Sequence, residues 1–360
     1  MSATVVILSC PQDLHAHAMC EALERKGAQA LLLYTPDFPE RTGLTIKLAG
    51  QRSVFASDGS SQVEFDDRGN SVWLRRPYFA KTPEDFEGED RKMIECECRD
   101  MLLSFFSLIS PNALWVNPLE CFFTERCKPT QLVAAQRCGL AIPPTLISND
   151  PREIINFVRE ATGSVIYKTF NSLVPTSVIT SDSLSEPDVL RWTPGIYQHY
   201  VEKDHELRVT VIGRRLFALR INSQQTARGK IDWREAQWQP RGGVSDLTFE
   251  PATLPKPIRR ACRSLVKELG LSYGAIDLVV TPDKEYVFLE INPSGQFLWI
   301  DHDAGIPLLD PMAEMLLQGR LDYTWDHRSP DVRFDAAFLQ AVEARRDRSL
   351  AEHVCDLRPW

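Results

Sequence analysis

The stretch from Gly274 to Asn292 constrains this chain more than any other, because it is a predicted β-hairpin with acidic side chains on one face. Two runs of alternating residues flank a Pro282-Asp283-Lys284-Glu285 turn, which predicts antiparallel strands joined by a two-residue loop. In that register Asp277 lies opposite Glu290, and Asn292 points to the same side. The other face is predicted to be apolar core, formed by Ile276, Leu278, Val280, Val287, Leu289 and Ile291.

The paired carboxylates of this hairpin require a positive partner. Two carboxylates facing each other across a strand pair repel by roughly 0.2–1 kcal/mol when exposed, and by more when buried. A divalent cation reverses that sign, and converging oxygens of Asp277, Glu290 and Asn292 suit Mg²⁺. A solvated hairpin face is the alternative. Val279 and Phe288, which this register places beside the acids, indicate a partly covered cleft and favour the metal site.

Composition describes an ordinary globular protein and argues against several classes. The 360 residues carry a net charge of -8, so nucleic acid is not expected as the main partner. No apolar run reaches the ~20 residues that cross a bilayer, so no membrane partner is expected either. The nine cysteines are an odd number, and the amino terminus lacks an export signal. We therefore expect reduced thiols, no disulfides and a cytoplasmic location.

The first 120 residues alternate strands and helices, which predicts an α/β fold with a partly parallel sheet. Strands at Thr4–Leu8 and Ala30–Tyr34 are predicted to enclose a helix over Gln12–Lys26, and a long helix follows over about 84–109. Between the second strand and the long helix, short strands are expected at Val63–Phe65 and Val72–Leu74. The chain contains neither a Gly-x-Gly-x-x-Gly sequence nor a Walker loop, so the common phosphate-binding fingerprints do not apply.

Cationic side chains on other predicted strands indicate an anionic ligand. Lys168 ends one apolar strand, and Arg208 and Arg220 alternate with small or polar residues on two others. Lys128 opens a helix and could reach the same site. Each could equally be a solvated surface charge. Together with the acidic hairpin they favour a nucleoside triphosphate, the common ligand that requires both Mg²⁺ and several Lys or Arg donors.

The order of these residues resembles the ATP-grasp superfamily, and further segments resemble its ribosomal peptide maturases, the graspetide synthetases such as the microviridin maturases. The superfamily resemblance rests on Lys128, Lys168, Gln198-His-Tyr-Val201, Glu206-Leu-Arg208, Arg220, Asp277 and Leu289-Glu-Ile-Asn-Pro293. The subfamily resemblance rests on Val72-Trp-Leu-Arg-Arg-Pro77, Ile231-Asp-Trp-Arg234 and Glu290-Ile-Asn-Pro-Ser-Gly-Gln-Phe297. The resemblance as a whole spans roughly residues 3–320.

The resemblance implies an ATP-grasp fold, in which two lobes clasp ATP and an N-terminal pre-ATP-grasp α/β domain precedes them. It places the pre-ATP-grasp domain at residues 1–119 and the central lobe at 120–195. The C-terminal lobe with the metal-binding hairpin would cover 196–322, and a helical tail 323–360.

The resemblance also implies how the nucleotide is held. Lys128 and Lys168 match the two lysines that contact the ATP phosphates, and Gln198 with Val201 matches the hinge that reads the adenine. The phosphate loop departs from the family pattern, because residues 170–176 contain no glycine. Backbone contacts from that loop would then come from Asn171 and Ser172.

The catalytic and metal assignments follow in the same way. Arg208 and Arg220 match cations beside the transferred phosphate, and Lys168 is expected to share that catalytic role. The expected Mg²⁺ ligands are Asp277, Glu290 and Asn292, which the hairpin register indicates independently.

The implied chemistry is ATP-dependent ligation. A carboxylate attacks the γ-phosphate of ATP and becomes an acyl phosphate, from which a nucleophile displaces phosphate. In a graspetide synthetase the carboxylate is a side-chain Asp or Glu of a ribosomal precursor peptide, which has a leader and a core. The nucleophile is a Ser or Thr hydroxyl, which gives a lactone, or a Lys amine, which gives a lactam. Relatives also suggest a homodimer.

A basic and aromatic segment is the predicted contact surface for the precursor, with a solvated hairpin as its alternative. It contains Arg228, Lys230, Trp233, Arg234 and Trp238. His205 could assist the incoming nucleophile or could be a solvated loop residue. Two rival functions share the ATP site: a ligase of small molecules or amino acids, including one that adds glutamate tails, and a nucleotide-binding regulator without catalysis.

Overall fold

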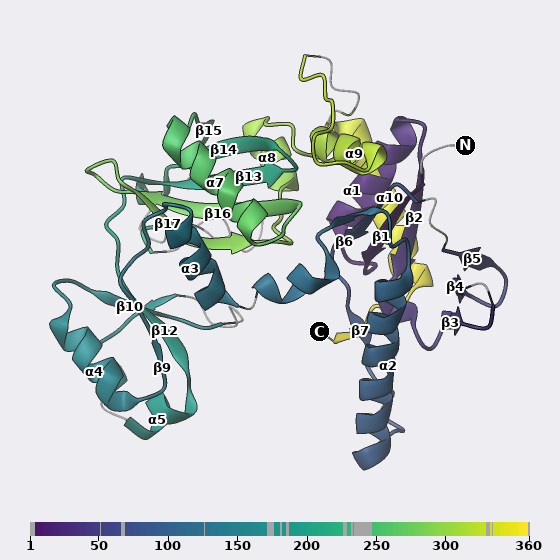
Figure 1. Ribbon diagram of the computed structural model, residues 1–360, viewed down its shortest axis with the longest axis horizontal. Coiled ribbons are helices and arrows are strands. Elements are labelled where there is room, and N and C mark those ends of the chain that lie inside the picture. Colours follow the sequence, from purple (N-terminus) through teal and green to yellow (C-terminus); the bar gives the residue numbers. More distant parts are fainter. Residues whose placement is uncertain are drawn as a thin grey trace. The chain divides into compact units, whose positions relative to one another are not determined.

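The chain forms two units that are each built around β-sheets (Figure 1). The computed structural model describes residues 4–50, 52–65, 69–125, 127–170, 176–180, 182–184, 187–225, 229–231, 233, 247–328, 332 and 334–358. The first unit contains residues 1–120, 212–214 and 296–360, and the second contains 121–211 and 215–295. Residues 296–322, which the sequence groups with the C-terminal lobe, thus cluster with the first unit, where helix α9 (Leu309–Gln318) packs on β1 (Thr4–Ser9) and β6 (Ser71–Leu74).

The described residues form further elements besides β1, β6 and α9. The other strands are β2 (Gln29–Tyr34), β3 (Gly43–Lys47), β4 (Ser53–Ser57), β5 (Gln62–Glu64), β7 (Phe79–Ala80), β8 (Leu114–Val116), β9 (Thr145–Ser148), β10 (Val165–Lys168), β11 (Ser177–Val178), β12 (Gly195–His199), β13 (His205–Ile212), β14 (Arg215–Ile221), β15 (Phe249–Pro251), β16 (Tyr273–Val280), β17 (Tyr286–Asn292) and β18 (Leu357–Arg358). The other helices are α1 (Leu14–Arg25), α2 (Gly88–Leu108), α3 (Lys128–Arg137), α4 (Pro151–Glu160), α5 (Pro187–Trp192), α7 (Lys256–Glu268), α8 (Leu298–Ala304) and α10 (Ala336–Glu352).

The first unit is organised around a parallel sheet with the strand order β2-β1-β6-β8. The α/β prediction is therefore confirmed for this region, including the strand–helix–strand start. Strands β3 and β4 were not predicted. They form an antiparallel sheet with β5, and their mostly half-exposed residues lack the continuous apolar run that identifies β1.

A buried ion pair explains the arginine that follows β6. The Nε of Arg75 lies 3.2 Å from Oδ2 of Asp13, and both side chains are almost completely buried. Although burial raises it, the neighbouring Arg75 guanidinium holds the pKa of Asp13 below its usual value. Asp13 also caps α1 by accepting a hydrogen bond from the His15 backbone. Nε2 of His15 in turn accepts the backbone N–H of Phe297, 2.9 Å away, which ties the segment before α8 to this unit.

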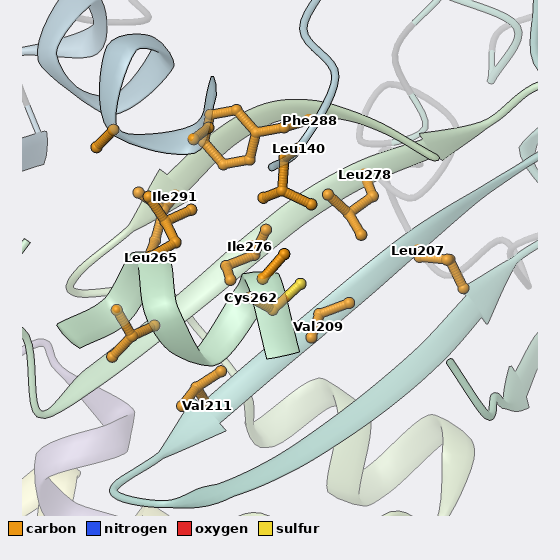
Figure 2. Close-up of a cluster of buried hydrophobic side chains, with 14 of the residues drawn as sticks. Leu140, Leu207, Val209, Val211, Cys262, Leu265, Ile276, Leu278, Phe288 and Ile291 are labelled. Carbon is orange, nitrogen blue, oxygen red and sulfur yellow. The ribbon is translucent and has the colours of Figure 1, made fainter. Parts of the chain in front are cut away.

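The second unit contains two antiparallel sheets. The smaller has the order β11-β10-β12-β9 and packs against α4 over Ile154, Val165, Leu190 and Tyr197. The larger has the order β15-β14-β13-β16-β17. Its core lies between one sheet face and helices α3 and α7, and Figure 2 shows Leu207, Val209 and Val211 of β13 pointing into it.

The predicted hairpin exists as β16 and β17, and the register prediction at its functional end is confirmed. Asp277 pairs with Glu290, and Ala275 pairs with Asn292. The predicted two-residue loop is wrong. The backbone N–H of Thr281 donates to the carbonyl of Glu285, so the loop has three residues and Lys284 takes a left-handed conformation with φ 67.

A β-bulge compensates for the longer loop. The pairing shifts between Asp277 and Leu278, because Leu278 pairs with Phe288 and leaves Leu289 as the extra residue. The prediction that Phe288 lies beside the acids is therefore wrong: Phe288 is completely buried in the core with Leu278 (Figure 2). Val287, predicted in the core face, instead pairs with Val279.

Two expectations about the environment can be compared with the structure. All nine cysteines are free thiols in the structure. Among the described residues, no helix combines the length and the apolar character that crossing a lipid bilayer requires.

Gly195 of β12 tests how tightly the smaller sheet is packed. A methyl group at this position would overlap the ring of Tyr167, whereas one at Gly163 would meet no atom within 4 Å. We expect Gly195→Ala to lower the free energy of unfolding by about 1–3 kcal/mol, because overpacking forces the ring or the strand to move. Gly163→Ala should change it by less than about 0.5 kcal/mol. Urea unfolding of both variants measures the difference, and equal stabilities would contradict the packing described here.

Candidate active site

Three oxygen-bearing side chains converge at one end of the β16–β17 hairpin. Nδ2 of Asn292 lies 3.4 Å from Oδ2 of Asp277 and 3.3 Å from Oε1 of Glu290. Asp277 is only 4% exposed, so its carboxylate is largely removed from water. The structure thus brings together all three residues that the sequence predicts as metal ligands.

Two cations balance the charge of this acidic group. Nη1 of Arg208, on β13, lies 2.7 Å from Oδ1 of Asp277, and both side chains are buried. Nζ of Lys128, the first residue of α3, lies 3.3 Å from Oε2 of Glu290. Lys128 and Arg208, which are far apart in the sequence, are therefore both placed at the acidic hairpin.

Two buried polar groups on β13 have no hydrogen-bond partner among the described residues. Within the described residues, Nε of Arg208 and the hydroxyl of Thr210 form no hydrogen bond. Because residues two apart on a strand share a face, both belong to the face opposite the Leu207 and Val209 core. Unpaired buried donors are costly, so these two indicate an acceptor-rich ligand.

Glu206 is a further member of this face that sequence reasoning did not assign to the site. It is 4% exposed, and Nζ of Lys203 lies 3.0 Å from its Oε1. Burial raises the pKa of Glu206, and the nearby Lys203 ammonium partly opposes that shift. The signal was present in the sequence, since Glu206 alternates with Arg208 along one strand.

The amide of Gln198 has one fixed and one open end. The Thr145 hydroxyl donates to the carbonyl of Pro143 at 2.7 Å, so it can only accept from Gln198, whose Nε2 lies 2.9 Å away. This fixes the orientation of the amide and leaves the buried Oε1 without a partner among the described residues. Thr145, which the sequence did not single out, thereby orients Gln198 as a hydrogen-bond acceptor.

Lys168 lies on the same sheet face as Gln198. In the β10–β12 pair, Lys168 is opposite Ile196 and Ile166 is opposite Gln198, and residues directly opposite share a face. The other face carries Tyr167 and Tyr197, which pack with the small core. Lys168, predicted to contact a phosphate, and Gln198, predicted to contact the adenine, are thus on one face of this sheet. Val201 directly follows this strand region and is half-buried.

The hydrogen-bond partners of Arg220 and His205 are residues other than Asp277 and Glu290. Nε of Arg220 donates to Oδ1 of Asn222 at 2.8 Å. Nδ1 of His205 lies 3.0 Å from Oδ2 of Asp204. Burial lowers the pKa of His205, and the positive charge of Arg220 contributes to that shift, whereas the Asp204 contact opposes it.

Part of the predicted peptide-contact segment is tied to the strand region around Tyr200. The Tyr200 hydroxyl donates to the carbonyl of Lys230 at 3.0 Å, and Nζ of Lys203 donates to the carbonyl of Ile231 at 2.7 Å. Trp233 was expected at the surface but is 3% exposed. Five predicted site residues lie outside the described part of the chain: Asn171, Ser172, Arg228, Arg234 and Trp238.

The donor set fits Mg²⁺ better than a transition metal. The described residues contain no group of three His, Cys, Asp or Glu side chains arranged for a metal ion. Two carboxylates and one amide converge instead, and the amide of Asn292 can present its oxygen by turning over. Oxygen ligands together with retained water and substrate phosphates are typical of Mg²⁺ sites.

Comparison with known proteins places this site in a family. Residues 4–122 match the model of the MvdD pre-ATP grasp domain. The chain is 31% identical in sequence to macrocyclase MdnC from Microcystis aeruginosa, whose crystal structure is bound to the precursor peptide MdnA. The similarity covers 87% of this chain and 99% of MdnC, with a TM-score of 0.76.

This chain belongs to the ATP-grasp peptide macrocyclases. The chain also resembles a RiPP-associated ATP-grasp ligase from Chryseobacterium gregarium, in complex with ADP and a leader and core peptide. The two are 25% identical over 87% of this chain and 96% of that one, with a TM-score of 0.76. PsnB, solved with a minimal precursor variant, Mg and ADP, shares the fold at 23% identity, with a TM-score of 0.65 over 88% and 98% of the two chains. Among curated proteins, no significant match to this chain was found.

The buried Arg208–Asp277 pair gives a stability prediction. Arg208→Met removes the guanidinium from a buried carboxylate, so we expect the free energy of unfolding in metal-free buffer to fall by about 3–5 kcal/mol. Arg152→Met, which breaks an exposed pair with Asp150, should cost less than about 1 kcal/mol. Urea unfolding with a chelator compares the two. Adding Asp277→Leu to Arg208→Met should restore stability, and equal losses in the two single variants would contradict this account.

Proposed function

We propose that this protein closes rings in a ribosomal precursor peptide by ATP-dependent ester or amide formation. The observation that carries the proposal is the convergence of Asp277, Glu290 and Asn292 between the cations Arg208 and Lys128. The similar proteins support it, because MdnC is bound to a precursor peptide and the Chryseobacterium ligase to ADP and peptide. The acceptor would be a Ser or Thr hydroxyl or a Lys amine.

The nucleotide would bind along the surface that carries Gln198 and Lys168. The open Oε1 of Gln198 would accept a hydrogen bond from the adenine amino group, and backbone groups near Val201 would contact the same ring. Lys128 and Lys168 would bind phosphates, with loop contacts from Asn171 and Ser172. The Mg²⁺ ligands would be Asp277, Glu290 and Asn292.

Charge neutralisation is the main task of the protein in this reaction. The substrate carboxylate attacks the γ-phosphorus, the bond to the β–γ bridging oxygen breaks, and ADP leaves. Both reactants are anions, so Arg208, Arg220 and Lys168 would offset the charge that accumulates. Bound Mg²⁺ would add Lewis-acid stabilisation of the phosphate oxygens. Holding both reactants in place replaces an improbable encounter in solution.

Glu206 would accept the proton released in the second half of the reaction. The hydroxyl or amine attacks the acyl carbon, inorganic phosphate leaves, and the nucleophile loses its proton. Burial raises the pKa of Glu206, which brings this carboxylate closer to the range where a general base is effective. His205, whose pKa the charge of Arg220 helps to lower, would be the alternative base.

The peptide would contact the segment that includes Lys230, with Arg228, Arg234 and Trp238 as further members. The anchors from Tyr200 and Lys203 support this placement, because they link the segment to the strands that carry Gln198 and Glu206. We further propose a homodimer in the cytoplasm. The nine free thiols are compatible with a reducing compartment.

Mass spectrometry of a candidate precursor after incubation with ATP and Mg²⁺ tests the proposed activity. Each ring closed should appear as the loss of one water, with one ADP formed. Glu290→Gln should form no rings, because the metal loses a charged ligand. ADP release that depends on a free amino acid, with no change in the peptide mass, would favour the small-molecule ligase instead. Absence of any ATP turnover by the wild-type protein would contradict both.

Gln198→Met should weaken ATP binding selectively. Losing one buried acceptor costs about 1–1.5 kcal/mol, so KM for ATP should rise roughly tenfold while kcat changes little. Gln136→Met, an exposed change on α3, is the matched control. Steady-state ADP release measures both constants. An unchanged KM in Gln198→Met would show that this amide does not read the nucleotide.

A further inference from the structure

Gln131 is a buried glutamine of α3 whose amide is engaged at both ends. Its Nε2 donates to the carbonyl of Thr124 at 2.6 Å, and its Oε1 accepts the backbone N–H of Ile291 at 3.0 Å. The residue is only 1% exposed. Both hydrogen bonds have the correct donor and acceptor, so the orientation of the amide is unambiguous.

The N–H group that Gln131 binds belongs to an edge strand. β17 is the last strand of the five-stranded sheet, so its outward backbone groups have no further strand to pair with. Two of them are satisfied from outside the sheet: Phe288 donates to the carbonyl of Ala141 at 2.8 Å, and Ile291 donates to Gln131. The side chain of Gln131 therefore replaces a neighbouring strand at this point.

Ile291 lies between the two metal-ligand candidates of β17. Glu290 precedes it and Asn292 follows it, and both side chains point to the face opposite Ile291. The hydrogen bond to Gln131 thus fixes the backbone from which both side chains project. The β-bulge at Leu289 lies immediately before this stretch, where the strand ladder is locally disrupted and supports the backbone less.

The same helix carries the cation that contacts Glu290. Lys128 precedes Gln131 by three residues, which places the two side chains on one face of α3, one turn apart. Both side chains contact β17, Lys128 through Glu290 and Gln131 through Ile291, and α3 lies beside β17 (Figure 1). Gln131 thus joins α3 to β17 by a direct hydrogen bond, in addition to the apolar packing, and helps to set the position of Lys128 relative to Glu290.

We propose that Gln131 is a positioning residue for the metal and phosphate site, acting on Glu290 and Asn292 through Ile291 and on Lys128 through α3. The inference rests on the proposed function. In this role the neutral, buried amide of Gln131 aligns Glu290, Asn292 and Lys128 without contacting their side chains. Groups that orient metal ligands in this way typically account for ~10–100-fold in metal affinity.

Binding of Mn²⁺, a paramagnetic substitute for Mg²⁺, tests the proposal without relying on turnover. Free Mn²⁺ is measured by electron paramagnetic resonance in the presence of ADP. Gln131→Met keeps the side-chain volume and removes both hydrogen bonds, so we expect its Mn²⁺ affinity to fall ~10–100-fold. Gln131→Glu keeps an acceptor for Ile291, so its affinity should lie between those of Gln131→Met and the wild type. Gln136→Met should behave as wild type.

A control separates positioning from general destabilisation. Leu132→Ala removes buried apolar volume from the same helix and lowers stability, but it leaves the hydrogen bond from Ile291 to Gln131 in place. We expect it to lower the thermal midpoint but to retain wild-type Mn²⁺ affinity. The proposal is overturned if Gln131→Met binds Mn²⁺ as the wild type does while Glu290→Gln does not, or if Leu132→Ala loses as much affinity as Gln131→Met. Wild-type Mn²⁺ binding by Glu290→Gln would instead refute the metal assignment of the proposed function.

Discussion

The buried carboxylate of Asp277 is the constraint on which the rest of the site depends. A charge at 4% exposure is tolerated only when it is paired, and Arg208 meets it at 2.7 Å from the adjacent strand. Glu290 adds a second negative charge on the next strand, which Lys128 meets from α3. These pairs link β13, β16, β17 and α3 by electrostatics as well as by the apolar core beneath them (Figure 2).

The hairpin illustrates how much of this could be predicted from the sequence. The prediction that Asp277 pairs with Glu290 is confirmed, although the reasoning behind it contains two errors that cancel. The loop has one residue more than expected, and the bulge at Leu289 takes up that extra residue before the acids are reached. The run Tyr286–Leu289 is apolar throughout, so it has no alternation of polar and apolar residues that could indicate a bulge. The face to which Phe288 points could therefore not be predicted from it.

Other features were not predictable for a different reason. Charge and alternation make residues such as Lys128 and Arg208 visible in the sequence, and the structure places both at the acidic hairpin. Thr145 and Gln131 are neutral and act through hydrogen bonds to partners distant in the sequence. Only the folded chain brings those partners together. The burial of Trp233 likewise depends on tertiary packing that no local pattern specifies.

The ion pairs of the site also bear on the order in which its ligands would bind. In the present arrangement Lys128 contacts Glu290, and the amide nitrogen of Asn292 faces both carboxylates. A metal ion needs the same carboxylate oxygens, so it competes with Lys128 for Glu290. Phosphate oxygens attract Lys128 more strongly than a single carboxylate does, since they carry more charge. Under the proposed function, binding of the nucleotide would draw Lys128 away and open Glu290 to Mg²⁺, so that each ligand favours the other. Gln131 holds the backbone of both partners in place during this exchange, which is why a neutral residue with no contact to either ligand belongs to the site.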